Sequence, residues 1–540
     1  MPDQLSYPGV YIQELPSGVH TITGVPTSIV AFVGPTLSGA PDMARTVTSF
    51  ADFERYYGGL WDGSALSYAV QQFYANGGQV AVIVRLLHEL GDDGKPLPAG
   101  GPISAKIELQ SGPTLSAKYP GSWGNNIRAR IDYATRDRSN DKLYNLTVFD
   151  PVSGLQEQYP NIEADAASTR ALDRVLQASA LVAVDLGDPP NRDTLGHRPE
   201  SNADVPFGQN PWTDGAGLLN YKSDQNGSDG QSADGKPVPL SVPDYAAPDG
   251  PTKKTGIYAL LDDNVFFNML CLPSFGEIDP GVWAQAAVLC RMKRAMLLVD
   301  PPMGWSDENS AETGFLRGRF NALGDDRKNA ALYFPRVVAA GPDGPQTEFA
   351  PCGVVAGIYA RTDAARGVWK APAGLDASLN GVTDLAVSLN NLENGRLNVL
   401  GVNCLRSFPI IGNVVWGART LMGADALANE WKYVPVRRLA LFIEESLYRG
   451  SQWIVFEPND EPLWAQIRLN FGAFMHDLFR QGAFQGTTPK DAYFVKCDSE
   501  TTIQNDIDQG IVNIIVGFAP LKPAEFVVIK IQQMAGQIAV

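Results

Sequence analysis

The sequence predicts a multidomain protein of α/β and α+β class, and three observations support this prediction. At 540 residues, the chain can hold about two to four domains with large cores. Apolar runs of strand length alternate with segments of helical periodicity, which is the pattern of α/β folds. A separate stretch alternates apolar and polar residues with period two, which predicts antiparallel strands with one solvated face.

Composition narrows the class of protein further. Hydrophobic residues make up 44% and charged residues 19%, as in ordinary soluble domains. The formal net charge of −16 argues against nucleic acid as a partner. The five scattered cysteines, with no Cys-x-x-Cys pair, predict reduced, buried thiols in a cytosolic setting. We find neither a signal-peptide pattern nor a run of ~18 apolar residues, so no membrane anchoring is expected.

The chain begins with an extended N-terminal arm (residues 1–24), in which a Pro-Gly turn precedes a short strand-like run. An α/β domain follows, in two pieces (25–102 and 256–400). In its first piece we expect strands at 28–34 and 79–87 and helices at 49–57 and 64–76. In its second piece we expect strands at 265–273, 295–300 and 332–338 and helices at 280–294 and 354–362.

Between these pieces lies an antiparallel β-rich insert (103–186), with strands at 103–110, 127–133 and 143–149 and a helix at 166–179. A Pro-Gly turn beside Trp123 leaves a carbohydrate-binding interpretation open. Residues 187–255 are rich in Pro, Gly, Asp, Ser and Asn, which predicts a long surface loop.

The C-terminal α+β domain (401–520) contains two predicted helices, at 434–450 and 462–480, separated by a strand at 453–456. Asp460 is the expected cap of the second helix. Strands at 491–497 and 511–518 then form a hairpin. The C-terminal arm (521–540) carries a third apolar run, at 525–531, with apolar residues on both faces. Such a strand either folds back onto its own hairpin, which spacing alone favours, or pairs with a neighbouring copy.

Residue patterns that carry catalysis or bind cofactors are missing from the sequence. No two of the four histidines have metal-ligand spacing, and neither a Gly-x-Ser-x-Gly elbow nor a Walker loop occurs. Asp300 ends a buried strand, as a catalytic Asp can, but no His or Ser stands in a matching context. Glu444 and Glu445 diverge by about 100° on a helix and so do not flank one substrate bond. The sequence therefore predicts a non-enzyme with no cofactor and no metal.

Long motifs then identify a family. The opening SYPGVYIQE (6–14), the segments 405–409 and 413–420, and the whole stretch 434–464 resemble contractile tail sheath proteins. This family comprises bacteriophage tail sheaths and the sheaths of phage-tail-like extracellular contractile injection systems. The likeness covers nearly the whole chain and is weakest in 187–255. One departure is Ile410, because sheath proteins often have Gly after the corresponding Phe-Pro.

The resemblance implies a subtilisin-like α/β middle domain without its catalytic residues, and a structural role. It implies stacked hexameric rings around an inner tube, whose contraction drives the tube through a target cell envelope. The implied partners are further copies of the chain, the inner tube protein, and the baseplate and tail terminator or cap proteins. Assembly is expected in the bacterial cytoplasm, and the mature site is the tail of a virion or released particle. A type VI secretion sheath subunit and a subtilisin-like hydrolase are the alternatives.

The resemblance also implies that terminal arms insert as strands into neighbouring sheets, which assigns three groups of residues. The donor strands are Val10, Tyr11, Ile12, Gln13, Glu14, Phe526, Val527, Val528, Ile529, Lys530 and Ile531. The acceptor hairpin contains Tyr493, Phe494, Val495, Ile511, Asn513 and Ile515. The candidate tube-facing helix presents Gln466, Asn470, Asp477 and Arg480.

Overall fold

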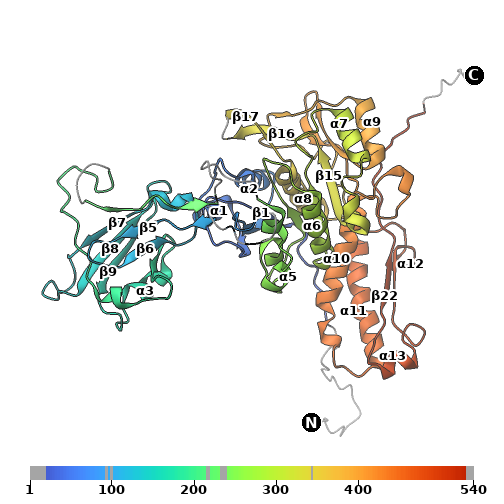
Figure 1. Cartoon of the computed structure of the whole chain (residues 1–540). Helices are drawn as coiled ribbons and strands as arrows, with labels where there is room; N and C mark the ends of the chain where they lie inside the picture. Colours follow the sequence, from blue (N-terminus) through green and yellow to red (C-terminus); the bar gives the residue numbers. More distant parts are fainter. Residues whose placement is uncertain are drawn as a thin grey trace, which may run out of the picture. The chain divides into compact units, whose positions relative to one another are not determined.

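The computed structural model describes residues 20–91, 95, 97, 101–213, 219–230, 240–341 and 344–530 (Figure 1). These residues form two compact units. The α/β unit comprises the described residues of Thr27–Arg366 and Ala371–Arg437. The C-terminal unit comprises those of Met1–Pro26, Gly367–Lys370 and Arg438–Val540.

An eight-stranded sheet is the centre of the described α/β unit. In order along the sheet, its strands are β2 (Arg45–Val47), β3 (Val80–Arg85), β1 (Ile29–Gly34), β13 (Met269–Cys271), β14 (Met296–Val299), β15 (Ala330–Phe334), β19 (Asn403–Phe408) and β20 (Gly412–Val415). The inner strands from β3 to β19 are parallel, and the two edge strands are antiparallel to their neighbours. Chain order reverses once, between β1 and β13, as in doubly wound sheets.

Helices cover both faces of this sheet, which explains why its inner strands are apolar throughout. Phe32 of β1 packs edge-on against Phe73 of α2, whereas Val33 belongs to the core on the side of Trp283 of α6. The helices of the unit outside the insert are α1 (Phe50–Tyr57), α2 (Ala65–Ala75), α4 (Val242–Ala246), α5 (Gly250–Lys253), α6 (Pro280–Met292), α7 (Glu308–Leu316), α8 (Cys352–Arg366) and α9 (Asn391–Leu400).

Capping and close packing fix the positions of these helices. Ser49 caps α1 by accepting from the amide of Asp52, and Asp279 caps α6 ahead of Pro280. Helices α2 and α8 approach so closely that a Cβ at Gly353 would lie 2.4 Å from the carbonyl oxygen of Ala69. Glycine is therefore required at that crossing.

Two strand predictions in this unit need correction. The run at 265–273 forms a strand only over β13, and the run at 332–338 is two strands, β15 and β16 (Val337–Gly341). Pro335 separates them, since proline has no N–H for a ladder. Strand β16 pairs instead with β17 (Gly344–Phe349) and β18 (Asp384–Leu385) in a small antiparallel sheet.

The boundary placed at residue 401 also needs correction. Strands β19 and β20 belong to the eight-stranded sheet, where Asn403 is opposite Tyr333 of β15. Asn403 is buried, and its amide donates to the carbonyl oxygens of Leu332 and Arg419. Residues 403–415 thus complete the α/β sheet and do not begin the C-terminal unit.

The insert is antiparallel, as its alternation predicts. Its sheets contain β4 (Pro102–Ile103), β5 (Lys106–Glu108), β6 (Thr114–Ala117), β7 (Arg128–Asp132), β8 (Leu143–Phe149), β9 (Gln156–Glu163), β10 (Val182–Asp185), β11 (Tyr221–Lys222) and β12 (Ser228–Asp229). Strands β11 and β12 pair with β7 and β4, so the insert extends into the stretch predicted to be loop. The helix predicted at 166–179 is too long, because the structure has only α3 (Leu172–Val175) and a 3-10 turn at Leu176–Ala178 in this range.

Buried polar contacts stabilise the two chain connections between the insert and the eight-stranded sheet. The Arg85 guanidinium lies 3.0 Å from Asp229 and donates to the carbonyl oxygens of Thr36 and Gly39. Burial lowers the pKa of Arg85 to about 10, against the opposing effect of Asp229. On the other passage, His88 Nδ1 lies 2.7 Å from an Asp244 carboxylate oxygen.

The C-terminal unit is a helical pair with a small sheet (Figure 1). Its elements are α10 (Val434–Gly450, whose first residues lie in the α/β unit), α11 (Glu461–Arg480), α12 (Pro489–Ala492), β21 (Tyr493–Lys496), α13 (Gln504–Asp508) and β22 (Ile515–Phe518). Leu439, Ile467 and Phe471 are in its core, which also receives Ile22 from the N-terminal segment. No helix among the described residues combines the length and apolarity that a membrane crossing requires.

Two predictions for this unit are wrong in detail. The strand expected at 453–456 is a 3-10 turn, Gln452–Ile454, followed by an exposed Phe456 at φ 72°. The connection between the two hairpin strands contains α13. Asp460 occupies the N-cap position of α11, but its side chain makes no capping hydrogen bond.

Candidate assembly site

The sheet of the C-terminal unit contains two strands, β21 and β22, among the described residues. They pair antiparallel, with Tyr493 opposite Phe518 and Lys496 opposite Ile515. Tyr493 and Phe518 face the core of the unit, whereas Phe494 and Ile515 are exposed on the other face. A two-stranded sheet is only marginally stable alone, so this one depends on α11 and leaves strand edges for a further strand.

The C-terminal arm runs on from β22 without pairing to it. As far as Lys530 it forms no strand, and the side chains of Phe526, Val527, Val528 and Ile529 are 75–80% exposed. The arm therefore does not fold back onto its own hairpin within the described residues, which corrects the alternative that spacing favoured. Among the described residues, no surface covers its apolar faces, which the sequence predicts to be buried. Ile531 lies outside the described residues.

The N-terminal donor residues 10–14 also lie outside the described residues. The described part of the N-terminal segment begins at His20, near the C-terminal end of α10. The ring of His20 stacks on that of Trp453 with centroids 4.2 Å apart, and the amide of Val25 donates to Ser446 Oγ. Ile22 is buried against the helical pair. Both arms are thus attached to the C-terminal unit.

The predicted acceptor residues divide into two groups. Tyr493, Phe494 and Val495 lie in β21 and Ile515 in β22, so the structure brings these together. Ile511 and Asn513 precede β22 and are outside the ladder. Asn513 is held instead by the α13 turn, because its amide side chain donates to Asp506 at 2.8 Å.

The predicted tube-facing residues also divide. Gln466, Asp477 and Arg480 are exposed on α11, but Asn470 is 1% exposed, and neither of its side-chain polar atoms has a hydrogen-bond partner among the described residues. Asn470 lies seven residues after Leu463 and three after Ile467, so it shares their buried stripe. The heptad spacing alone could have excluded it from the exposed face.

Asp300 is placed as a structural residue. It is fully buried at the end of β14, and its Oδ1 accepts from the backbone amide of Cys352 at the start of α8. Burial raises its pKa to about 6, partly offset by the hydrogen bond from Cys352 and by the Arg336 guanidinium. No histidine is hydrogen-bonded to Asp300 in the described part of the chain. There, too, no cluster of three or more His, Cys, Asp or Glu residues has metal-binding geometry.

An exposed apolar arm follows a two-stranded sheet in the described part of the C-terminal unit. Comparison with known proteins shows which proteins this unit is similar to. Residues 428–534 match the family model described as phage tail sheath C-terminal domain. This range contains α10, α11 and the two-stranded sheet, so the resemblance to contractile tail sheath proteins is confirmed.

Two relatives and one solved structure are similar to this chain. The tail sheath protein of Vibrio phage KVP40 is 27% identical over 174 residues, which cover 32% of this chain and 24% of that protein. A protein of Pseudomonas aeruginosa strain UCBPP-PA14, named as a prophage major tail sheath protein, is 25% identical over 288 residues. That match covers 51% of this chain and 67% of the relative, so the chain spans only part of the sheath proteins that it matches.

The fold is similar to that of the PVC sheath complex of an extracellular contractile injection system in its contracted state. The TM-score is 0.55 at 21% identity, and 98% of each chain is covered. The multidomain α/β architecture is thus that of sheath proteins.

Proposed function

We propose that this chain is the structural sheath subunit of a contractile tail. Copies polymerise as stacked hexameric rings around an inner tube, and shortening of the polymer drives the tube through a target cell envelope. The observation that carries the proposal is the exposed apolar arm, residues 526–529, attached to a two-stranded sheet. The names of the relatives, all sheath proteins, support the same function.

In this proposal the arms act as tethers between copies. An inserted strand of this length makes about five backbone hydrogen bonds, each contributing roughly 0.5–1.5 kcal/mol net. Burial of the exposed apolar side chains adds roughly 25 cal/mol per Å². Since the described part of the arm forms no strand within its own unit, insertion into a neighbour keeps copies connected while their α/β units change position.

The other partners follow from the same proposal. Gln466, Asp477 and Arg480, exposed on α11, are the candidates for contact with the inner tube. Baseplate and terminator or cap proteins would bind the ends of the polymer, and assembly would take place in the bacterial cytoplasm. No step in this function requires a cofactor or catalysis, because the energy of contraction is stored when the subunits assemble.

Deletion of residues 524–540 tests the proposal. The side chains of 526–529 contribute little to the isolated chain, so the variant should remain folded by circular dichroism and gel filtration but form no tubes by negative-stain microscopy. A matched control replaces exposed Phe207, in the insert, by Ser and should assemble normally. Normal tubes from the deletion variant would refute the arm as a tether.

A further inference from the structure

The hydrogen-bond pattern of the β21–β22 hairpin fixes which backbone groups point to the outer edges of the sheet. The amide of Ala519 donates to the carbonyl oxygen of Ala492, so these two residues form a hydrogen-bonded pair across the hairpin. Such pairs alternate with non-hydrogen-bonded pairs along an antiparallel ladder, so the pairs at Phe494 and Lys496 are hydrogen-bonded as well. The strand residues that direct their N–H and C=O groups outward are therefore Tyr493, Val495, Val516 and Phe518.

The outer edge of β21 is already engaged at both ends. The amide of Tyr493 donates to the carbonyl oxygen of Pro489 in α12. The carbonyl oxygen of Cys497, directly after β21, accepts from the guanidinium of Arg468. Only Val495 lies between these contacts with its outward backbone groups unbonded among the described residues. A strand added to this edge would have to break the contacts at both ends.

The outer edge of β22 carries no such contacts. In the described part of the chain, the backbone groups of Val516 and Phe518 form no hydrogen bond on this side, and neither do those of Ile514, directly before the strand. Three successive outward residues thus offer both N–H and C=O groups. An open row of this kind is the template to which an extended segment adds as a further strand.

The two faces of the sheet differ in what an added strand would meet. On the inner face, Val516 and Phe518 pack against the apolar core that α11 completes. On the outer face, Ile515 is 49% exposed, and the ring of Phe494 lies so close over Gly517 that a Cβ there would be 2.2 Å from a ring carbon. Side chains of an added strand therefore enter the core on one side and border water on the other.

The C-terminal arm also has two unequal sides. Alternation along the apolar run separates its residues into two rows. The rows are Phe526, Val528 and Lys530 on one side, and Val527, Ile529 and Ile531 on the other. Lys530 is the one charged residue of this run, and an unpaired ammonium group is costly to bury. Glu525 precedes the run and already has a polar or charged interaction in its own chain. The row of Val527 is thus the one suited to a core.

We infer that the arm of a second copy pairs with the outer edge of β22, with Val527 and Ile529 against the core and Val528 and Lys530 on the outer face. The inference rests on the proposed function and deepens it, since it assigns the edge that receives the arm and the side chains that enter the neighbour. Val527 and Val528 are 80% and 78% exposed in the single chain. Two neighbours of equal exposure thus have unequal roles in assembly.

The matched variants Val527→Lys and Val528→Lys test the assignment of the two sides in the full chain. Both should melt at the wild-type temperature, because both positions are exposed before assembly. Val527→Lys should require at least about a hundredfold more protein to form tubes, because the charge would enter an apolar core. Val528→Lys should require less than about threefold more. Equal thresholds, or the reverse order, would overturn the assignment and leave the proposed function intact.

Cysteine cross-linking tests the edge. The natural cysteines are all buried, so introduced pairs supply the reactive thiols. Ile515→Cys on the outer face of β22 is combined with Val528→Cys or, as the control, with Val527→Cys. Oxidation of assembled protein should link copies about tenfold more in I515C/V528C, because thiols held on the same face of adjacent strands have a millimolar effective concentration. Replacing the arm positions by Phe526 and Ile529 repeats the comparison for a register shifted by two residues.

Cross-linking at control level in both outward pairs, from protein that assembles normally, would overturn the inference and leave the proposed function intact. If wild type forms no tubes, the proposed function fails. The same pairs in concentrated soluble protein then decide the contact alone. An excess of linked dimers from I515C/V528C over I515C/V527C would support pairing at the β22 edge, and equal yields would overturn it.

Discussion

The eight-stranded sheet of the α/β unit and the two-stranded sheet of the C-terminal unit differ in what pairs with their edge strands. In the eight-stranded sheet, edge strand β20 receives a covering segment: the amides of Gly374 and Leu379 donate to Val415 and Asn413. The other edge is the three-residue strand β2, too short to recruit a partner. In the C-terminal unit, no third strand pairs with β21 or β22 among the described residues, and the amide of Gln485 donates to Ala519 just after β22. The first sheet is finished within one chain, whereas the second has open edges among the described residues.

This difference predicts that substitutions in the first sheet change folding stability, whereas substitutions in the second change association between copies. Side chains of β14 are buried on both faces, so changes there should act on the free energy of unfolding. Changes to the exposed side chains of β21 and β22 should instead affect polymer formation. Three substitutions test this division, in order of decreasing effect on stability.

The largest effect is expected from Leu298→Ala in β14. Leu298 is fully buried, so the loss of its side chain should lower the free energy of unfolding by about 2–5 kcal/mol. Urea denaturation followed by tryptophan fluorescence measures this. The matched change Ile515→Ala in β22 should cost less than about 0.5 kcal/mol, because Ile515 is half exposed. Equal losses of unfolding free energy in the two variants would contradict the difference between the two sheets.

An intermediate effect is expected from Asp300→Asn and depends on pH. The folded-state pKa of Asp300 is raised to about 6, above its usual unfolded value of about 3.9. Between these values the folded chain holds a proton that the unfolded chain releases, so wild-type stability should rise as pH falls from 6 to 4. At pH 7 to 8 the variant should be more stable, by on the order of 2 kcal/mol.

Unfolding curves from pH 4 to 8 check this, with exposed Asp141→Asn as the control. The pH slope between 4 and 6 should flatten in Asp300→Asn and persist in the control. Identical slopes in both variants would show that the buried carboxylate does not govern the pH dependence of the α/β unit.

The smallest effect on stability is expected from Phe494→Glu on the open face of β21. Phe494 is exposed in the single chain, so the melting temperature should change little. Assembly should nevertheless weaken, because an incoming strand would lie beside an uncompensated charge. Sedimentation of polymers, compared with Leu392→Glu on exposed α9, measures the difference. A large loss of stability would mean that this face is part of the fold and not an interface.

Strong periodicity made some elements predictable. Strand β1 and helix α2 carry unbroken apolar patterns with Ser64 as cap and Gly77 after the helix, and both lie within one residue of their expected bounds. Weaker signals gave a wrong prediction. Residues 453–456 are predicted to be a strand because Trp, Ile, Val and Phe favour strands. In the structure they form the tight turn between α10 and α11, where β propensity has no partner strand to act on.

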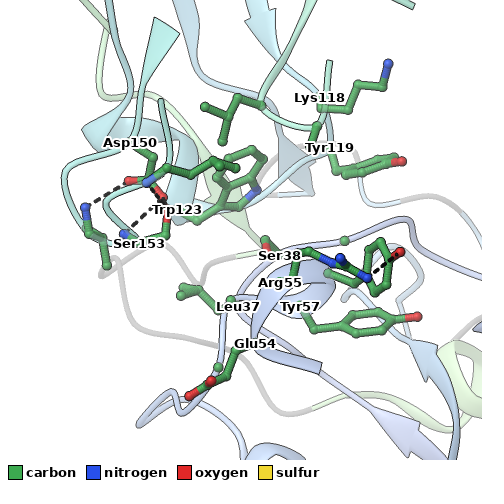
Figure 2. A pocket seen from close by; sticks show the side chains of 18 of the residues that line it. Leu37, Ser38, Glu54, Arg55, Tyr57, Lys118, Tyr119, Trp123, Asp150 and Ser153 are labelled. Atoms are coloured by element: carbon green, nitrogen blue, oxygen red, sulfur yellow. Dashed lines mark hydrogen bonds between the residues drawn. The ribbon is translucent and has the colours of Figure 1, made fainter. Parts of the chain in front are cut away.

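The candidate site was only partly predictable for a similar reason. The strand-like runs at 491–497 and 511–518 located the hairpin, but they could not show which edges stay open. A groove lined by Tyr56 and Leu155 (Figure 2) was missed entirely, because its walls come from five separate segments of the chain and no local pattern links these two residues.

The sequence by itself determined the class of fold, the positions of its best-patterned strands and helices, and the family resemblance, since these depend on local periodicity and on long motifs. Tertiary structure alone decided that residues 403–415 finish the large sheet, that Asn470 is buried, and that the arm forms no strand as far as it is described, to Lys530. Each of these depends on which distant segment supplies hydrogen bonds or covers an apolar face, and pairing between distant segments leaves no mark in local spacing.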